Sequence, residues 1–581
     1  MSFTAARTTA RARRLTVIMV AAALVAGITT TGVSPARAAT TLVCPATAGQ
    51  TVPTPDRLTR PPSLAAVTVR SAGGVPERAY AGMMIPQAVI HDPVVDRTYI
   101  AYFSPGAAVP STGRTPVNTV IAAVDSAGVV RERSVLARAD GTPVLFDQGA
   151  ATPVSAGGNV NDSHNALTME IDSAGYVHVA GNVHNNDLPY WRSAAPHSVA
   201  AMRWKSALPG VKVFPNGVSI LAASADRVAT SPRLLVGPGG RLFLSFRHWV
   251  SGDASLFLYS YDTTTSVWSS VSGGTSMPNP NPAYSYTEGR PLLDGRAQGL
   301  DGSLSLSPET SGPVRGPDGR WWLVWSWRDL ASSADSNSRV SVARSSDLVT
   351  WYTVSGKRLP ATIEYSLVDE SPEYASLVVE NLTRSGSGLL NNQIAIGWDT
   401  AKRPVISYFR YVGSGSARTT QLVAARPNGL SSAWIATPAS RWTGVYDLSG
   451  GASTTVLQTS GSGAVPVAGG RLELAYQCNG VSRVLTIATG SFTGSSVFVR
   501  DDVATASNVP IEADSLPAGA PTTLAVRRAE SPAVAIDGVH RRWLLTWGSG
   551  PWIVDGTAPA PGSFPTEGSP MRLVVVAVDP S

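Results

Sequence analysis

The sequence predicts an all-β protein with the architecture of a seven-bladed β-propeller. The chain of 581 residues has 54 Gly and 43 Pro, and it contains many short runs in which apolar and polar residues alternate. A period of two is typical of strands, and almost no segment shows the period of an amphipathic helix. A turn followed by a strand with aromatic or β-branched residues recurs at intervals of 65 to 84 residues, which is typical of repeated blades.

Seven such units occur, and each strand starts directly after a turn. In chain order they cover residues 98–103, 176–181, 241–246, 320–325, 404–409, 471–476 and 541–547. Their intervals exceed those of a minimal four-stranded blade, and long loops on one face account for the excess. Two β-sandwich domains in tandem are the alternative, but no linker divides the series. We therefore expect residues 39–581 to form a single propeller domain.

The N-terminus predicts export. Four arginines within residues 7–14 precede an apolar run over 15–28, and Ala36-Arg37-Ala38 offers the small residues of a cleavage site. We therefore expect residues 1–38 to be a secretory signal peptide and the mature protein to be a secreted monomer. No later segment has enough consecutive apolar residues to span a bilayer, so no membrane partner is expected.

The formal charge of +6 comes almost entirely from that N-terminal segment. Residues 1–38 hold five arginines and no acidic residue, which leaves the mature chain near +1. Without a basic stripe, the sequence does not predict nucleic-acid binding. Cys44 and Cys478 are the only cysteines. In an exported protein they can form one disulfide, with two unpaired thiols as the alternative.

A histidine-rich hairpin is the main clue to function. The first predicted strand covers residues 166–172 and the second covers 176–183, with His164 just before the hairpin and His184 just after it. Both side chains therefore belong to the loops of one face. Two imidazoles placed together can share a ligand, a proton transfer or a metal.

The propeller geometry nominates further residues at the same face. In each blade the first strand leaves one face and the second strand returns to it, so residues at those two ends surround the entrance of the central channel. The nominated residues are Met84, Gln87, Tyr102, His164, Asn165, His184, Tyr190, Ser231, Arg233, Arg247, His248, Trp327, Arg328, Asn391, Asn392, Tyr408 and Arg410.

This set is rich in Arg, His, Asn and Tyr and poor in carboxylates, which suits an acidic ligand because guanidinium and amide groups hold carboxylates by paired hydrogen bonds. We assign to substrate binding Asn165, Ser231, Arg233, His248, Arg328, Asn392 and Tyr408.

Other residues are expected to be structural. His178 lies inside a predicted strand, where a buried and hydrogen-bonded histidine is more common than a catalyst. The tryptophans of residues 320–325 are expected to pack between blades. The turns at Asp262 and Asp347 look like degraded versions of the Asp-box turn of sialidase-type propellers. The oxygen-bearing residues within 159–162 fit either a calcium site or a polar turn, which leaves a calcium requirement open.

Five motifs follow one another along residues 85–430: DSHN with HVAGNVHNNDLPYWRS, TSP with GRLFLSFR, WSWRD, ARSSDLVTW, and LLNN with PVISYF. Together they resemble the BNR-repeat propellers that include ulvan lyases and rhamnosyl-glucuronate lyases. In the ulvan lyases of this fold, two histidines, a tyrosine and an arginine form the site. The resemblance places the histidines at His164 and His184 and the arginine at Arg247. The tyrosine position is Ser231 here, and Tyr190 is the candidate substitute because a serine hydroxyl is a poorer proton shuttle than a phenol.

The resemblance implies β-elimination on a uronic acid. We expect Arg247, with Asn165 or a cation, to neutralise the carboxylate, and His164 to remove the C5 proton. His184 orients the substrate or acts as the acid. Ulvan and rhamnose-capped glucuronate of plant gums are the first candidate substrates. The alternatives are a sialidase-like glycoside hydrolase, which usually needs a carboxylate pair or an acid beside a tyrosine, and a non-catalytic carbohydrate-binding propeller.

Overall fold

The computed structural model describes parts of the unit that begins at Cys44. The described residues are 63–80, 88–106, 116–141, 143, 145–147, 166–186, 188–205, 229–250, 252–273, 290–295, 306–329, 336–384, 386–390, 392–428, 433–448, 457–467, 469–478, 481–492, 497–503, 518–519, 525–549 and 567–578. The predicted signal peptide, residues 1–38, lies outside them.

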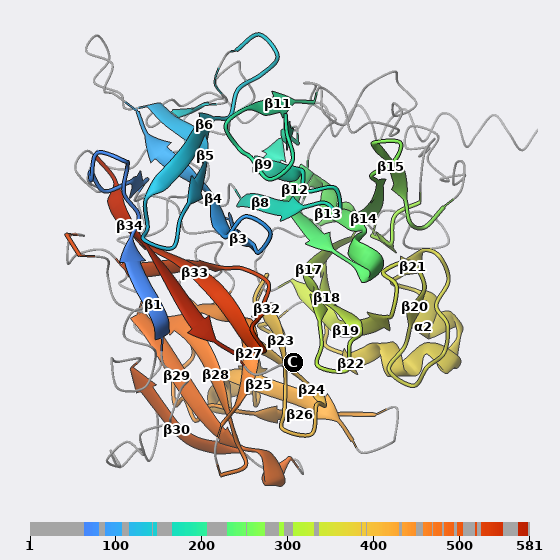
Figure 1. Cartoon of the computed structure of the whole chain (residues 1–581). Coiled ribbons are helices and arrows are strands. Elements are labelled where there is room, and N and C mark those ends of the chain that lie inside the picture. The colour runs from blue at the N-terminus through green and yellow to red at the C-terminus, as the bar shows by residue number, and fades with distance from the viewer. Residues whose placement is uncertain are drawn as a thin grey trace, which may run out of the picture. The chain divides into compact units, whose positions relative to one another are not determined.

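Strands dominate the described residues, and they form the seven antiparallel blades of a β-propeller, as predicted (Figure 1). Blades 1 to 3 consist of β3 (Ala88–Asp92), β4 (Arg97–Pro105), β5 (Pro116–Val124), β6 (Val130–Val135); β8 (Ala166–Ile171), β9 (Val177–Asn186), β10 (Tyr190–Ser193), β11 (Met202–Trp204); and β12 (Ala229–Val236), β13 (Leu242–Val250), β14 (Asp253–Asp262), β15 (Val267–Ser270). Blades 4 to 6 consist of β17 (Leu306–Arg315), β18 (Trp321–Asp329), β19 (Asn337–Ser345), β20 (Trp351–Tyr352); β23 (Ile394–Trp398), β24 (Pro404–Val412), β25 (Thr419–Pro427), β26 (Trp434–Pro438); and β27 (Leu457–Val467), β28 (Arg471–Cys478), β29 (Val481–Ala488), β30 (Phe498–Val503).

Blade 7 joins the two ends of the described chain. Its strands are β31 (Ala525–Glu530), β33 (Val539–Ser549), β34 (Ser569–Ala577) and, as the outermost strand, β1 (Ser63–Thr68). In Figure 1 the blue β1 lies beside the red β34, and the register runs from Ser63 opposite Val576 to Thr68 opposite Arg572. The N-terminal strand therefore completes the last blade.

Short elements decorate the blades. The extra strands are β2 (Arg78–Ala79), β7 (Leu145–Asp147), β16 (Leu293–Asp294), β21 (Ile363–Glu364), β22 (Val378–Glu380) and β32 (Val534–Ile536). The helices are η1 (Pro238–Gly240), α2 (Leu367–Glu370), η3 (Pro372–Leu377), η4 (Gly415–Ala417) and η5 (Thr489–Ser491). None of these helices in the described part of the chain has the length and apolar character needed to cross a membrane.

The seven units read from the sequence are the second strands of the seven blades. They coincide with β4, β9, β13, β18, β24, β28 and β33. The first strands of neighbouring blades lie against one another, with β3 beside β8 and β31, β8 beside β12, and β23 beside β17 and β27. The first strands therefore form the inner ring around the channel, and one face collects their starts and the ends of the second strands.

The hydrophobic core lies between the blades. Separate clusters fill the spaces between blades 1 and 2, 2 and 3, 3 and 4, and 4 and 5, and one packs blade 1 against blade 7. Between blades 5 and 6, Phe409, Trp442 and Tyr476 form a cluster of rings. Trp321 and Trp325 pack between blades 3 and 4 and Trp322 between blades 4 and 5, which confirms their predicted role.

Aspartates fix the tight turns between strands. Oδ1 of Asp172, at the β8–β9 turn, accepts hydrogen bonds from the N–H groups of residues 174 and 176, and Asp125 and Asp399 do the same two and four residues further on. Gly175 completes its turn with φ +83, which favours glycine. A Cβ there would lie 2.4 Å from Nε2 of His197, and the other ring nitrogen of His197 lies 2.7 Å from Asp92 at the end of β3. This turn of blade 2 therefore packs against a residue that contacts blade 1.

The two predicted Asp-box-like turns are also closed by aspartate side chains. Asp262 accepts from the N–H groups of residues 264 and 265, and Asp347 accepts from those of residues 349 and 350. The tryptophan after each turn, Trp268 or Trp351, is buried. At the end of β28, Cys478 is disulfide-bonded, and the one other cysteine in the sequence, Cys44, lies outside the described residues.

Candidate active site

An ion pair between blades 3 and 4 marks the channel face. Arg247, near the end of β13, donates through Nη1 to the Glu309 carboxylate near the start of β17. The other Glu309 oxygen accepts from the hydroxyl of Ser307 at 2.8 Å, and that hydroxyl in turn accepts from the N–H of Gly252 at 2.8 Å. Both members of the ion pair are buried, so the guanidinium is held in one place.

A second guanidinium lies beside this pair. Arg328, near the end of β18, is half-buried. Burial lowers the pKa of Arg328; the nearby Glu309 carboxylate opposes that effect, and the positive charge of Arg247 adds to it. The two arginines therefore share one carboxylate, which leaves net positive charge at this position.

Arg233 adds a third guanidinium on the inner strand β12. Its side chain is exposed, yet the surrounding protein lowers its pKa by desolvation. Water therefore reaches part of this residue, although the surrounding protein disfavours its charged form. Arg233 is also the site of an irregularity, because the register of β12 against β13 shifts between Thr230 and Arg233.

Ser231 occupies this bulge. Its φ of +53 is unusual for a residue other than glycine, and its side chain is exposed. A bulge turns a side chain away from the regular alternation of the strand. The position that the resemblance assigns to a tyrosine is therefore a strained, solvent-facing position beside the arginines.

The backbone aligns one of the predicted catalytic histidines with Arg247. His184 on β9 is opposite Thr230 on β12, and Thr230 is opposite Arg247 on β13. The three residues form one row across the junction of blades 2 and 3. His164 and Asn165 lie outside the described residues, as do the candidate calcium ligands within 159–162.

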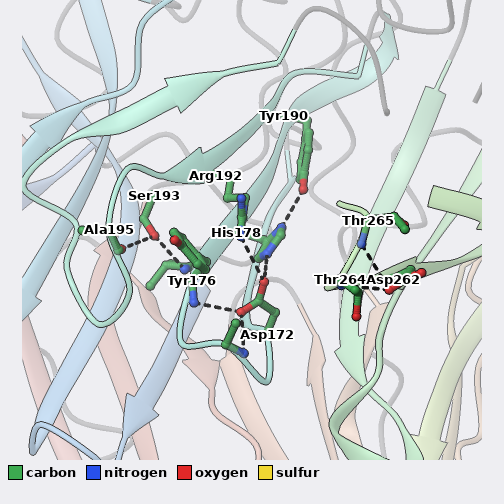
Figure 2. A network of polar contacts seen from close by, with 12 residues as sticks. Asp172, Tyr176, His178, Tyr190, Arg192, Ser193, Ala195, Asp262, Thr264 and Thr265 are labelled. Atoms are coloured by element: carbon green, nitrogen blue, oxygen red, sulfur yellow. Dashed lines mark hydrogen bonds and ion pairs between the residues drawn. The ribbon is translucent and has the colours of Figure 1, made fainter. Parts of the chain in front are cut away.

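Tyr190 does not lie at the channel, which corrects its predicted catalytic placement. It is on β10, the third strand of blade 2, and is only 1% exposed. Figure 2 shows its hydroxyl directed at the ring of His178, with 2.5 Å between the oxygen and Nδ1. On the other side of that ring, Nε2 lies 3.0 Å from Oδ2 of Asp172. His178 is thus the buried, hydrogen-bonded histidine predicted, and Tyr190 is part of the same core network.

Two further substrate-binding assignments are also corrected by burial. Tyr408 is 0% exposed and donates to Glu380 at 2.5 Å, and His248 is buried with its ring packed edge-on against Phe257. Asn392 is exposed, in a left-handed conformation with φ +57, just before β23. The candidate site therefore keeps the accessible residues Ser231, Arg233, Arg328 and Asn392 at the channel face, with the buried Arg247 behind Arg328, and it loses Tyr408 and His248.

Sequence comparison places the chain in a family. The model of the "BNR repeat-containing family member" group matches residues 98–442, which is more than half of the chain. The chain belongs to the BNR repeat-containing family. Comparison of this BNR-repeat protein with curated proteins finds no match.

Several solved structures resemble the BNR-repeat chain. An ulvan lyase described as a new family of polysaccharide lyase has a TM-score of 0.46 and 12% identity, over 88% of this chain and 96% of that one. The polysaccharide lyase Uly1 has a TM-score of 0.44 and 10% identity, over 90% and 100%. An α-L-arabinofuranosidase of Fusarium graminearum has a TM-score of 0.32 and 13% identity, over 71% and 92%. With TM-scores below 0.5, none of these likenesses assigns an activity to this chain.

Glu309 is the site residue that the sequence analysis of this BNR-repeat protein missed. The nominated positions were the expected starts of first strands and ends of second strands, and blade 4 contributed only residues from the end of its second strand. Glu309 lies inside the first strand of that blade, β17, where it contacts Arg247. Its one sequence signal is a carboxylate in an otherwise uncharged stretch, Gly302 to Val314. Among the described residues, no group of three or more His, Cys, Asp or Glu side chains is arranged to hold a metal ion.

Proposed function

We propose that the protein is a secreted polysaccharide lyase that cleaves a uronate-containing polymer, with glucuronate linked to rhamnose as the preferred unit. The observation that carries the proposal is the positive charge at the channel face, where Arg247 and Arg328 lie beside the single carboxylate of Glu309. Arg233 adds a third guanidinium on β12, the strand that pairs with β13. An excess of guanidinium groups suits an anionic sugar.

The arginines have different roles in this proposal. Arg328 and Arg233 are the guanidinium groups that solvent reaches, so they are placed to hold the substrate carboxylate. Arg247, which the sequence analysis expected to neutralise the carboxylate, is buried and paired with Glu309, so in this proposal it adds positive charge behind them. Neutralising the carboxylate lowers the pKa of the C5 proton and stabilises the enolate that forms when the proton leaves.

The elimination needs a base and an acid as well. The base takes the C5 proton, the C–H electron pair forms the C4–C5 double bond, the C4–O4 bond breaks, and the departing oxygen takes a proton. We assign the base to His164 and the acid to His184. The row that joins His184 to Thr230 and Arg247 supports a position of His184 close to the arginines.

The test is the appearance of ultraviolet absorbance, because the unsaturated uronate absorbs and the saturated one does not. The mature protein is mixed separately with ulvan, gum arabic and other uronate polymers, with and without a chelator. A rise in absorbance on one polymer identifies the linkage that is cleaved. Loss of that rise in the presence of chelator shows that the reaction requires a metal ion. Release of reducing sugar without absorbance would instead show a hydrolase, and binding without either signal would show a carbohydrate-binding propeller.

Variants locate the reaction. Arg328→Gln should lower kcat/KM by roughly 100-fold or more, in line with the loss of one charge-stabilising donor, with little change in the unfolding midpoint. Arg320→Gln is the matched control, because Arg320 precedes the other end of β18 and contacts the exposed Asp318 turn. His164→Ala and His184→Ala should abolish turnover in the folded protein. Equal losses in the two arginine variants would exclude the channel face as the reaction site.

A further inference from the structure

A second arginine site lies on the other side of the propeller ring. Arg527 is the third residue of β31, the inner strand of blade 7, and is only 6% exposed. It lies near the strand's start, so it shares the channel face with Arg247 and Glu309. Blade 7 is three blades from blade 3 in one direction and three from blade 4 in the other, which places Arg527 opposite the ion pair.

Two glutamines of blade 6 hold this guanidinium. Nη1 of Arg527 donates to Oε1 of Gln477, near the end of β28, and to Oε1 of Gln458, near the start of β27, at 3.4 Å. Both glutamines are half-buried, so they are more accessible to solvent than Arg527 itself. A third amide, Gln393, lies on the same face just before β23, with its oxygen bound to the N–H of Thr459.

The positive charge of Arg527 has no counterion in the described part of the chain. Its Nε atom is buried without a hydrogen-bond partner there, and burial lowers the pKa of Arg527 to about 10. Two other buried arginines have a carboxylate partner: Arg339 pairs with Asp369 at 2.9 Å and Arg247 pairs with Glu309. Glutamine oxygens orient a guanidinium but do not cancel its charge, and a buried charge without a counterion destabilises the folded protein.

We propose that Arg527, oriented by Gln458 and Gln477, is a second anion-binding site that takes an oxyanion group, carboxylate or sulfate, of the polysaccharide. The assignment of that anion to a polymer rests on the proposed function, whereas the binding site itself does not. A chain lying across the channel mouth would meet the arginines of blades 3 and 4 at one side and Arg527 at the other. The substrate would then carry at least two anionic groups.

The first experiment measures anion binding without turnover. The full chain is unfolded thermally in sodium sulfate, in sodium glucuronate and in sodium chloride at equal ionic strength, as wild type, Arg527→Gln and Arg528→Gln. Arg528 is the matched control, since it is the next residue on β31 and is already paired with Glu530 at 3.0 Å. Subtracting the Arg527→Gln response removes the general stabilisation that sulfate gives to any protein.

We expect sulfate or glucuronate to raise the unfolding midpoint of wild type and Arg528→Gln more than that of Arg527→Gln. Without added anion, Arg527→Gln should be at least as stable as wild type, because it removes an unpaired buried charge. A response to sulfate alone would identify a sulfated sugar, and one to glucuronate alone a uronate. Equal responses in all three proteins, or a lower midpoint of Arg527→Gln without anion, would overturn the proposal.

The second experiment separates this site from the proposed reaction. On a polymer that is cleaved, Arg527→Gln should raise KM by roughly 10- to 100-fold, the loss expected for one charge-assisted contact, with kcat nearly unchanged. Arg527→Lys, which keeps the charge, should recover part of the affinity. Anion binding at Arg527 in a protein without elimination activity would refute the proposed function and leave the site standing; an unchanged KM would refute its use by the substrate.

Discussion

Replacing Glu170 with glutamine should remove a large part of the pH dependence of stability. Glu170 lies on β8, the inner strand of blade 2, opposite His178 in the register, and is 5% exposed. Burial raises the pKa of Glu170 from 4.5 to about 8. Between these two values the folded protein keeps a proton that the unfolded chain has lost, so the stability falls as the pH rises.

The size of the effect follows from the shift. Each pH unit in this window changes the free energy of unfolding by about 1.4 kcal/mol, so Glu170 should lower it by roughly 2 to 3 kcal/mol between pH 5 and pH 7. The contribution is fully present below the unfolded pKa and is lost as the pH approaches 8. Glu170→Gln stays neutral throughout, so its stability relative to wild type should increase steadily over the same range.

Urea unfolding of both proteins, followed by tryptophan fluorescence at pH 5, 6, 7 and 8, measures the difference directly. Other titrating groups, including the buried His178, contribute to both proteins and cancel in the comparison. A difference between the two proteins that stays constant from pH 5 to pH 8 would refute the burial argument. It would show that Glu170 is ionised in the folded protein and stabilised by a neighbouring group.

Two other substitutions test the corrected placements. Tyr190→Phe removes the hydrogen-bond partner of His178 Nδ1 and should lower the free energy of unfolding by about 1–3 kcal/mol. The value of kcat/KM should stay within a few-fold of wild type. A large loss of kcat/KM at unchanged stability would instead show that Tyr190 acts in the active site. Gly175→Ala places a Cβ 2.4 Å from the His197 ring, at a residue whose backbone is left-handed. The substitution should therefore break the contact of 2.7 Å between His197 and Asp92 and lower the thermal midpoint by several degrees. An unchanged midpoint would show that the β8–β9 turn of blade 2 accommodates the methyl group without cost.

The fold could be predicted because each second strand carries its own local signal. A tight turn closed by Gly175, Gly240 or Gly319 precedes an apolar strand, and these residues are adjacent in sequence. The position of β1 carried no such signal. Its residues Ser63 to Thr68 alternate weakly, and their partner strand β34 lies at the other end of the chain, so only the folded structure reveals the pairing.

The parts of the candidate site that could be predicted are those that depend on local sequence signals. Arg247 and Arg328 lie at strand ends, and strand ends follow from the turns. Tyr190 was placed at the end of the second strand, but β9 ends at Asn186 and Tyr190 is the first residue of the third strand, β10. Tyr408 is the fifth residue of β24, where alternation directs it between blades 4 and 5 toward Glu380. The strand to which Tyr190 belongs and the sheet face on which Tyr408 lies depend on backbone geometry, which residue type alone does not determine.

The strand that completes blade 7 has a consequence for how the protein reaches its native state. Ser63 and Val576 pair although more than 500 residues separate them, so this ladder has a very high contact order and the ring cannot close until the last strands are present. Blades 1 to 6 are formed from neighbouring segments and can assemble as synthesis proceeds, whereas closure waits for the two ends to meet. Once formed, the same ladder has to break before the ring can open, so resistance to slow unfolding and proteolysis should depend more on β1 and β34 than on any single blade.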